Sequence, residues 1–351
     1  MSRAPLLLPL LFVACRQVAG IQPITYQNTG GDGGGGCTNA TMVLSSTNYL
    51  DVMTITNGYV VIANASETDF TYTNLYACSL GTPCTQPPGL LSLAFNDALY
   101  SYAASSQIYY ALQTSAAGAG AIHSLSFDGK TDTVLLGTAT FPTYTAVSGT
   151  HVFWVSDDQS GSSASVHCIG CSGPGDQTWI SGLTAAYGLF ADANNVYVVS
   201  DDSSVNGTMG IYGCSVTAAC NAAPRKVIEG ITIQALNVGA QAAGDGTNVY
   251  VTNDSSAIVS VGPTGTQTDV VKGTAALSLA VDPSTSDLFY ATDQGQILRI
   301  KSDGTGTAAP LSTCDPQSPN AVIGLAFDTA NVYALVQPST TSSTVYAIKR
   351  N

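Results

Sequence analysis

Aspartates and histidines are the residues of this chain that could carry out acid–base or metal chemistry. Asp157, Asp201, Asp254 and Asp293 recur 44, 53 and 39 residues apart, and a ring of such carboxylates could bind calcium, which prefers oxygen ligands. An aspartate that recurs in this way can equally cap a turn, and the chain has no Asp-x-Asp-x-Asp-Gly loop. We therefore expect structural aspartates and no cofactor, with calcium as the open alternative.

The chain has three histidines, and their positions bear on nucleophilic catalysis. A Ser-His-Asp triad is defined in space rather than in sequence, so it stays possible, but no Gly-x-Ser-x-Gly turn supports it. His123 and His167 take a strand position that holds tyrosine elsewhere, as at Tyr76 and Tyr212, and His151 precedes a strand. We expect these histidines to pack within the fold. Five arginines, two of them near the N-terminus, are too few for a cluster that binds a carboxylate.

The composition indicates that strands, not helices, position these residues. Only two glutamates, Glu67 and Glu229, stand beside 21 aspartates, and the chain is rich in threonine, serine, glycine, valine and tyrosine. Helix surfaces use Glu, Lys, Gln and Ala instead, which excludes an all-α fold. The formal net charge is -13, and binding to phosphate backbones depends on lysine and arginine. We therefore expect no nucleic-acid partner.

A repeat runs through most of the chain, with a short apolar run, Ala-x-Asp, a turn and then Val-Tyr. Its clear copies are Leu189–Asp192 with Asn195–Val198, Leu279–Asp282 with Leu288–Tyr290, and Leu325–Asp328 with Asn331–Tyr333. The aligned aromatic residues lie about 46 positions apart and are Tyr59, Tyr109, Phe153, Tyr197, Tyr250, Phe289 and Tyr333. A second strand of period two follows each of them, which is typical of a sheet with one packed face.

Seven such units fit residues 37–351, at about 45 residues each, the length of a four-stranded propeller blade. One blade cannot bury both of its faces, so the blades must stack around an axis until the ring closes. The sequence predicts an all-β fold, a seven-bladed β-propeller. Six or eight blades are the alternatives, because the first two copies of the repeat match it only weakly.

The sixth unit carries a family resemblance. Its Phe289-Tyr290-Ala291-Thr292-Asp293, followed by Ile297-Leu298-Arg299 and Asp303-Gly304, resembles the YWTD repeat of extracellular propellers, with Ala291 in place of Trp. The preceding Leu-Ala-Val-Asp turn is similar to NHL and TolB-like bacterial propellers. The resemblance implies a bacterial extracytoplasmic propeller with a binding face, and it implies no reaction, because propellers host unrelated functions.

The N-terminus predicts export. Residues 1–14 have one positive charge and the apolar run Leu6–Ala14, as in a signal peptide. Phe12-Val13-Ala14-Cys15 resembles a lipobox, so Cys15 is the expected lipid attachment site and residues 15–36, with their glycines, the tether. We expect an outer-membrane or cell-envelope lipoprotein, anchored to the membrane only through this lipid. The alternative is cleavage after Val18-Ala19-Gly20 and a secreted or periplasmic protein.

Eight cysteines remain beyond Cys15, an even number, as expected for disulfides in an oxidising compartment. Cys78 with Cys84, Cys168 with Cys171 and Cys214 with Cys220 share one place in the repeat and predict local disulfides. Cys168 and Cys171 could instead be half of a zinc site or a redox pair. By elimination Cys37 pairs with Cys314, which would help to close the ring. We expect residues 40–45 or 21–26 to supply the outer strand of the last blade.

The connections between the second and third strands are longer in units seven, one, two, three and four, and so form one arc around the ring. Loops on a rigid scaffold commonly carry recognition, and Phe70 and Tyr72 are the aromatic residues of this arc. We expect a non-enzymatic binding or scaffold propeller that presents the arc to a protein or a glycan. The alternative is a propeller enzyme, a hydrolase or lyase, with a metal near the axis. No oligomer is predicted.

Overall fold

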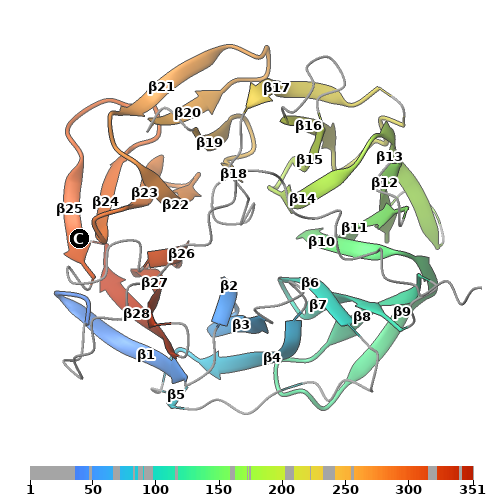
Figure 1. Ribbon diagram of the computed structural model, residues 1–351, viewed down its shortest axis with the longest axis horizontal. Helices are drawn as coiled ribbons and strands as arrows, with labels where there is room; N and C mark the ends of the chain where they lie inside the picture. Colours follow the sequence, from blue (N-terminus) through green and yellow to red (C-terminus); the bar gives the residue numbers. More distant parts are fainter. Residues whose placement is uncertain are drawn as a thin grey trace, which may run out of the picture.

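The computed structural model describes residues 36–46, 50–65, 72–81, 84–85, 90, 98–114, 118–158, 163–171, 173, 175–201, 209–221, 223–231, 242–253, 257–314, 322–339 and 342–350. These residues form strands that are arranged as seven blades around an axis (Figure 1). The predicted seven-bladed β-propeller is therefore confirmed. Within the same ranges no helix is present that could cross a membrane.

The strands of each blade follow one another from the axis outward (Figure 1). Blades one to four contain β2 (Leu50–Thr56), β3 (Tyr59–Ala65) and β4 (Tyr72–Ser79); β6 (Ala98–Ala104), β7 (Ile108–Gln113), β8 (Ala119–Leu125) and β9 (Asp132–Thr140); β10 (Pro142–Ser148), β11 (His151–Asp157), β12 (Ala164–Ile169) and β13 (Asp176–Leu183); β14 (Ala186–Ala191), β15 (Asn195–Asp201), β16 (Met209–Ser215) and β17 (Arg225–Ile231). Blades five to seven contain β18 (Ala242–Gly244), β19 (Val249–Asn253), β20 (Ala257–Val261) and β21 (Gln267–Lys272); β22 (Ala276–Asp282), β23 (Asp287–Thr292), β24 (Gln296–Lys301) and β25 (Ala309–Thr313); β26 (Val322–Phe327), β27 (Asn331–Ser339), β28 (Ser342–Lys349) and β1 (Ala40–Ser46).

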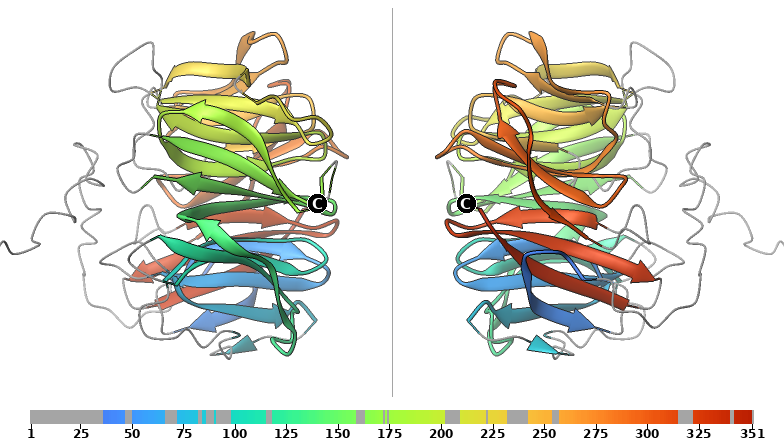
Figure 2. Two further views of the ribbon diagram at one scale, coloured as in Figure 1. Left: turned by 90° about the vertical axis from the view of Figure 1, so that its right-hand side faces the viewer. Right: turned by 90° about the vertical axis from the view of Figure 1, so that its left-hand side faces the viewer.

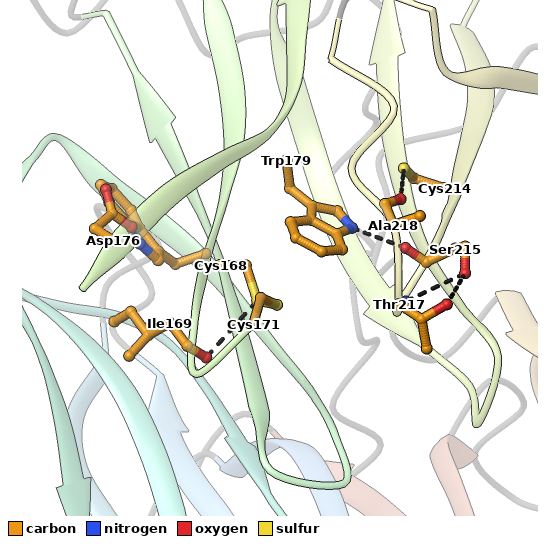
Figure 3. Close-up of a disulfide and its surroundings, with 10 residues drawn as sticks. Cys168, Ile169, Cys171, Asp176, Trp179, Cys214, Ser215, Thr217 and Ala218 are labelled. Carbon is orange, nitrogen blue, oxygen red and sulfur yellow. Dashed lines mark hydrogen bonds between the residues drawn. A yellow bond between two sulfur atoms is a disulfide. The ribbon is translucent and has the colours of Figure 1, made fainter. Parts of the chain in front are cut away.

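The hydrophobic core lies between neighbouring blades. Between blades three and four, for example, Phe153 and Trp179 pack against Leu189 and Val198. The indole Nε1 of Trp179 donates a hydrogen bond of 2.8 Å to the carbonyl of Ser215 in the next blade (Figure 3). Each blade thus buries its faces only against its neighbours, which is the physical reason for the ring.

An N-terminal strand completes blade seven. β1 pairs antiparallel with β28 from Ala40 opposite Ile348 to Ser46 opposite Ser343. Residues 40–46 therefore provide the expected outer strand, while residues 21–26 lie outside the described part. Because the first strand of the ring and the last three share one sheet, the two ends of the chain hold the ring closed.

Within the described residues, blade one contains three of the four predicted strands. β2, β3 and β4 are present, but β5 (Cys84–Thr85) pairs parallel with β1, at the edge of blade seven. The backbone N–H of Leu90 donates a hydrogen bond of 2.7 Å to the carbonyl oxygen of Leu75 on β4.

Four disulfides join the pairs expected from the cysteine positions: Cys37–Cys314, Cys78–Cys84, Cys168–Cys171 and Cys214–Cys220. Cys168 and Cys214 both belong to the core between blades three and four, and Figure 3 shows them on either side of Trp179. The bond between Cys37 and Cys314 connects the residues before β1 to the end of β25, the outer strand of blade six. It spans 277 residues of the chain.

Candidate functional site

A groove between blades six and seven gathers cations of this acidic chain. Arg299 and Lys301 lie on β24, Lys349 ends β28, and Arg350 follows it, at the side of the ring where both side views place the C-terminus (Figure 2). Half of the eight lysines and arginines in the described residues are these four. The fold brings together two of the five arginines, Arg299 and Arg350, which are 51 positions apart in the sequence.

Arg350 fixes the floor of this groove. Its Nη2 donates to the carboxylate of Asp282, and its Nη1 donates to the backbone oxygen of Asp328 at 2.6 Å. The guanidinium lies 5.0 Å from the ring centre of Phe289 and 5.4 Å from that of Phe327, which adds a cation–π attraction. The side chains of Arg350 and Asp282 are 11% and 5% exposed, so this ion pair between the two blades is buried.

The carboxylates around Arg350 are held in their charged form. Burial opposes the ionisation of Asp282, but hydrogen bonds from Ser284 and Arg350 outweigh it and lower the pKa of Asp282 to about 2. Burial likewise opposes the ionisation of Asp328, and hydrogen bonds from Tyr333 and from backbone N–H groups lower its pKa. Both carboxylates are therefore ionised at neutral pH, as the neighbouring cations require.

Two cations of the groove keep donors for a ligand. Lys301 is engaged, because its Nζ lies 2.8 Å from an oxygen of Asp287. Arg299 uses Nη1 for the carbonyl of Arg350, at 2.5 Å, which leaves its other N–H groups. Lys349 is exposed, and its side chain has no hydrogen-bond or ion-pair partner within the described ranges. Both line a groove of about 550 Å³, together with Asp282, Ser284, Thr285, Asp287, Thr329, Ala330 and Arg350.

A repeated turn explains why this groove forms at blade six. In blades four, five and seven, an Asp-x-x-Asn-Val-Tyr turn lets the aspartate accept a hydrogen bond from the tyrosine five residues later; the pairs are Asp192–Tyr197 at 3.0 Å, Asp245–Tyr250 at 2.7 Å and Asp328–Tyr333 at 2.6 Å. Blade six has Phe289 at the tyrosine position, opposite Ala280 of β22. Asp282 therefore lacks this partner, and Arg350 of the next blade binds it instead. The replacement of Tyr by Phe at an aligned position was the sequence signal for this site.

A second groove, of about 440 Å³, lies between blades four and five. Here Asp192 accepts the N–H of Gly246 across the blade boundary at 3.0 Å, and Arg225 donates to the carbonyl of Pro263, also at 3.0 Å. Arg225 is the one charged residue in its lining as described, so this groove is the less cationic of the two.

Several residues singled out in the sequence do not meet in one site. Cys15, Phe70 and Asp254 lie outside the described residues. Tyr72 is the first residue of β4, paired with Leu99, and not a loop residue as expected. Asp157 and Asp201 end β11 and β15, and Asp293 follows β23. Among the residues with described positions, no three His, Cys, Asp or Glu side chains are grouped so that they could hold a metal ion.

Comparisons with known proteins show the fold and no more specific relationship. The chain matches no protein-family model and no curated protein sequence. It is similar to the extracellular domain of the one-component system BT4673 from B. thetaiotaomicron, with a TM-score of 0.56 and 11% identity over 90% of this chain, which covers 40% of that chain.

Two further solved structures that it resembles are a chain of the Mitotic Checkpoint Complex and YCF48 bound to D1 peptide. The first has a TM-score of 0.58 and 13% identity, over 89% of this chain and 94% of that one. The second has a TM-score of 0.53 and 12% identity, over 88% and 93%. These are β-propeller proteins, so the likeness shows the fold. The four disulfides of the chain are typical of proteins that fold in an oxidising compartment.

Proposed function

We propose that this chain is an exported binding propeller, anchored through a lipid on Cys15, that holds an anionic ligand between blades six and seven. The observation that carries the proposal is the pair of available cations, Arg299 and Lys349, in a groove whose other charges are already matched. Because the chain has a net charge of -13, most of its surface repels anions. A local cluster of positively charged donors therefore determines where an anionic ligand binds.

The lining favours a carboxylated glycan as the ligand. Ser284, Thr285 and Thr329 offer hydroxyl groups and Asp287 an acceptor, which match the hydroxyl groups of a sugar. Ala330 is the one apolar residue in the lining as described, so the groove has no pocket for the aromatic or aliphatic anchors that dominate protein interfaces. Arg299 and Lys349 would bind the sugar carboxylate by charge-assisted hydrogen bonds.

Calorimetric titration with an oligomer of galacturonic acid tests the proposal, with its carboxyl-reduced, neutral form as the control ligand. We expect the acidic oligomer alone to bind, and more weakly as salt is added. Replacement of both Arg299 and Lys349 by alanine should weaken binding at least tenfold, or about 1.4 kcal/mol. Lys130→Ala, an exposed cation of blade two, is the matched control and should leave the affinity unchanged.

Three results contradict the proposal. They are no binding of the acidic oligomer, equal binding of the neutral oligomer, or unchanged affinity in the double variant while it remains folded. The last result would show that the glycan binds to another part of the surface.

We also propose that the arc of longer loops, which includes Phe70, contacts a protein of the cell envelope. The second strands β3, β7, β11, β15 and β27 lead into these loops, whereas the groove is lined by residues of the turns after β22 and β26, by Arg299 of β24 and by the end of β28. Because neighbouring strands in a blade are antiparallel, the second strands end at the face of the ring opposite to the one where the first and third strands end. Glycan and protein could then be bound together.

A further inference from the structure

Blades two and three share a set of three side chains, one on each of their second, third and fourth strands. In blade two, His123 stacks on Tyr110 with ring centres 4.9 Å apart, and its Nδ1 lies 3.1 Å from Asp132. In blade three, His167 stacks on Trp154 at 4.5 Å, and its Nδ1 lies 2.8 Å from Asp176. The aromatic residue also donates to the aspartate in both blades, at 2.8 Å from Tyr110 and 2.9 Å from Trp154.

Blade three adds a fourth member. The Oγ of Ser165 lies 2.9 Å from Nε2 of His167. Ser165 stands two positions before the histidine on β12, so both side chains point to the same face of the strand. Ala121 occupies the corresponding position before His123 of blade two. The aromatic–His–Asp set is therefore common to two blades, and the serine is the feature that distinguishes one of them.

We propose that Ser165 is a nucleophile activated by His167 and Asp176. The connectivity is that of a serine hydrolase triad: the serine hydroxyl to Nε2, and Nδ1 to a carboxylate. Trp154 holds the second oxygen of Asp176, which fixes the carboxylate and hence the imidazole orientation and tautomer. The side chains of His167 and Asp176 are 18% and 23% exposed, and Ser165 is partly exposed, so small reagents can reach the group.

The substrate class is small activated esters. Ser165 Oγ attacks the carbonyl carbon while its proton passes to Nε2 of His167. The bond from the carbonyl carbon to the leaving-group oxygen then breaks, and the leaving group departs with that proton. Water, deprotonated by His167, next attacks the acyl-serine and releases the acid, which restores the hydroxyl of Ser165. This activity lies between blades two and three and does not depend on the groove of blades six and seven.

Labelling with a fluorophosphonate tests the nucleophile. Attack by Oγ forms a bond to phosphorus, and fluoride leaves while His167 takes the proton. We expect intact-mass measurement and peptide mapping of the folded chain to find one phosphonyl group, on Ser165, and none on Ser165→Ala. Ser156→Ala is the matched control, because Ser156 lies opposite Ser165 on β11 and donates to the carbonyl of Thr140 instead of to a histidine. Absence of the label from Ser165 in the folded wild-type chain overturns the proposal.

Blade two allows the triad to be rebuilt. In the Ser165→Ala background, Ala121→Ser should restore labelling, now at position 121, because His123 and Asp132 already hold the geometry. His167→Gln should slow labelling by about a hundredfold or more, the usual contribution of a general base. No label at position 121, or labelling of Ser165 at an unchanged rate in His167→Gln, would show that this connectivity does not activate the serine.

Discussion

Replacement of Arg350 by alanine should lower the free energy of unfolding by about 3 to 5 kcal/mol, the usual cost of removing one partner of a buried ion pair. The variant leaves Asp282 charged and buried, and it removes the cation from between Phe289 and Phe327. Equilibrium denaturation in urea measures the loss. Lys272→Ala is the control, since the pair of Lys272 with Asp269 is exposed and should contribute less than about 1 kcal/mol.

The same ion pair gives the wild-type chain a defined acid sensitivity. The folded pKa of Asp282 is about 2, below the ordinary aspartate value of 3.8, so the unfolded chain binds more protons between these values. The stability that this carboxylate contributes is complete above about pH 4 and is lost as the pH falls toward 2. Arg350→Ala should flatten this part of the pH profile, and a profile identical to that of the wild type would contradict the proposed role of Arg350.

Replacement of both Cys37 and Cys314 by alanine should have the largest effect of any disulfide removal. The bond closes a loop with a sequence separation of 277 residues, for which the chain-entropy model gives about 5 to 6 kcal/mol. The bond also holds the backbone beside β25, where the N–H of Thr38 donates to Thr313 at 3.0 Å. Denaturant unfolding of the oxidised variant against the oxidised wild type measures the difference.

Removal of the Cys168–Cys171 bond is the comparison for this effect. The two residues are three positions apart, and the same model gives about 2 kcal/mol for so short a loop. Equal losses of stability for the two double variants would show that the long disulfide restricts the unfolded chain no more than the short one does. That result would contradict the effect expected for the Cys37–Cys314 bond.

The repeat carried enough information to predict the fold. Seven aromatic residues at similar spacing indicated seven blades, and Phe153, Tyr197 and Tyr250 are indeed buried on second strands. The cysteine pairs also followed from the repeat, because residues at one place in each blade share one geometry. The repeat did not predict that β5 (Cys84–Thr85) pairs with β1 at the edge of blade seven, because that contact joins two blades.

The groove could not be predicted in the same way. Arg350 and Asp282 are 68 positions apart and belong to different blades, so their contact depends on how blade seven packs against blade six. The set of Ser165, His167 and Asp176 could be predicted in part. Side chains alternate along a strand, which places Ser165 and His167 on one face, but the position of Asp176 beside them depends on the register of β12 with β13.

Every site described here lies between two neighbouring blades or on a blade held by its neighbours, so each requires a ring closed by β1. Hydrogen exchange of the oxidised wild-type chain, resolved by peptide, tests this closure most directly. We expect the amides of residues 40–46 to exchange as slowly as those of β28, with which they pair. Complete exchange of residues 40–46 at the earliest time point, with β26 to β28 still protected, would contradict the closure and the groove that depends on it.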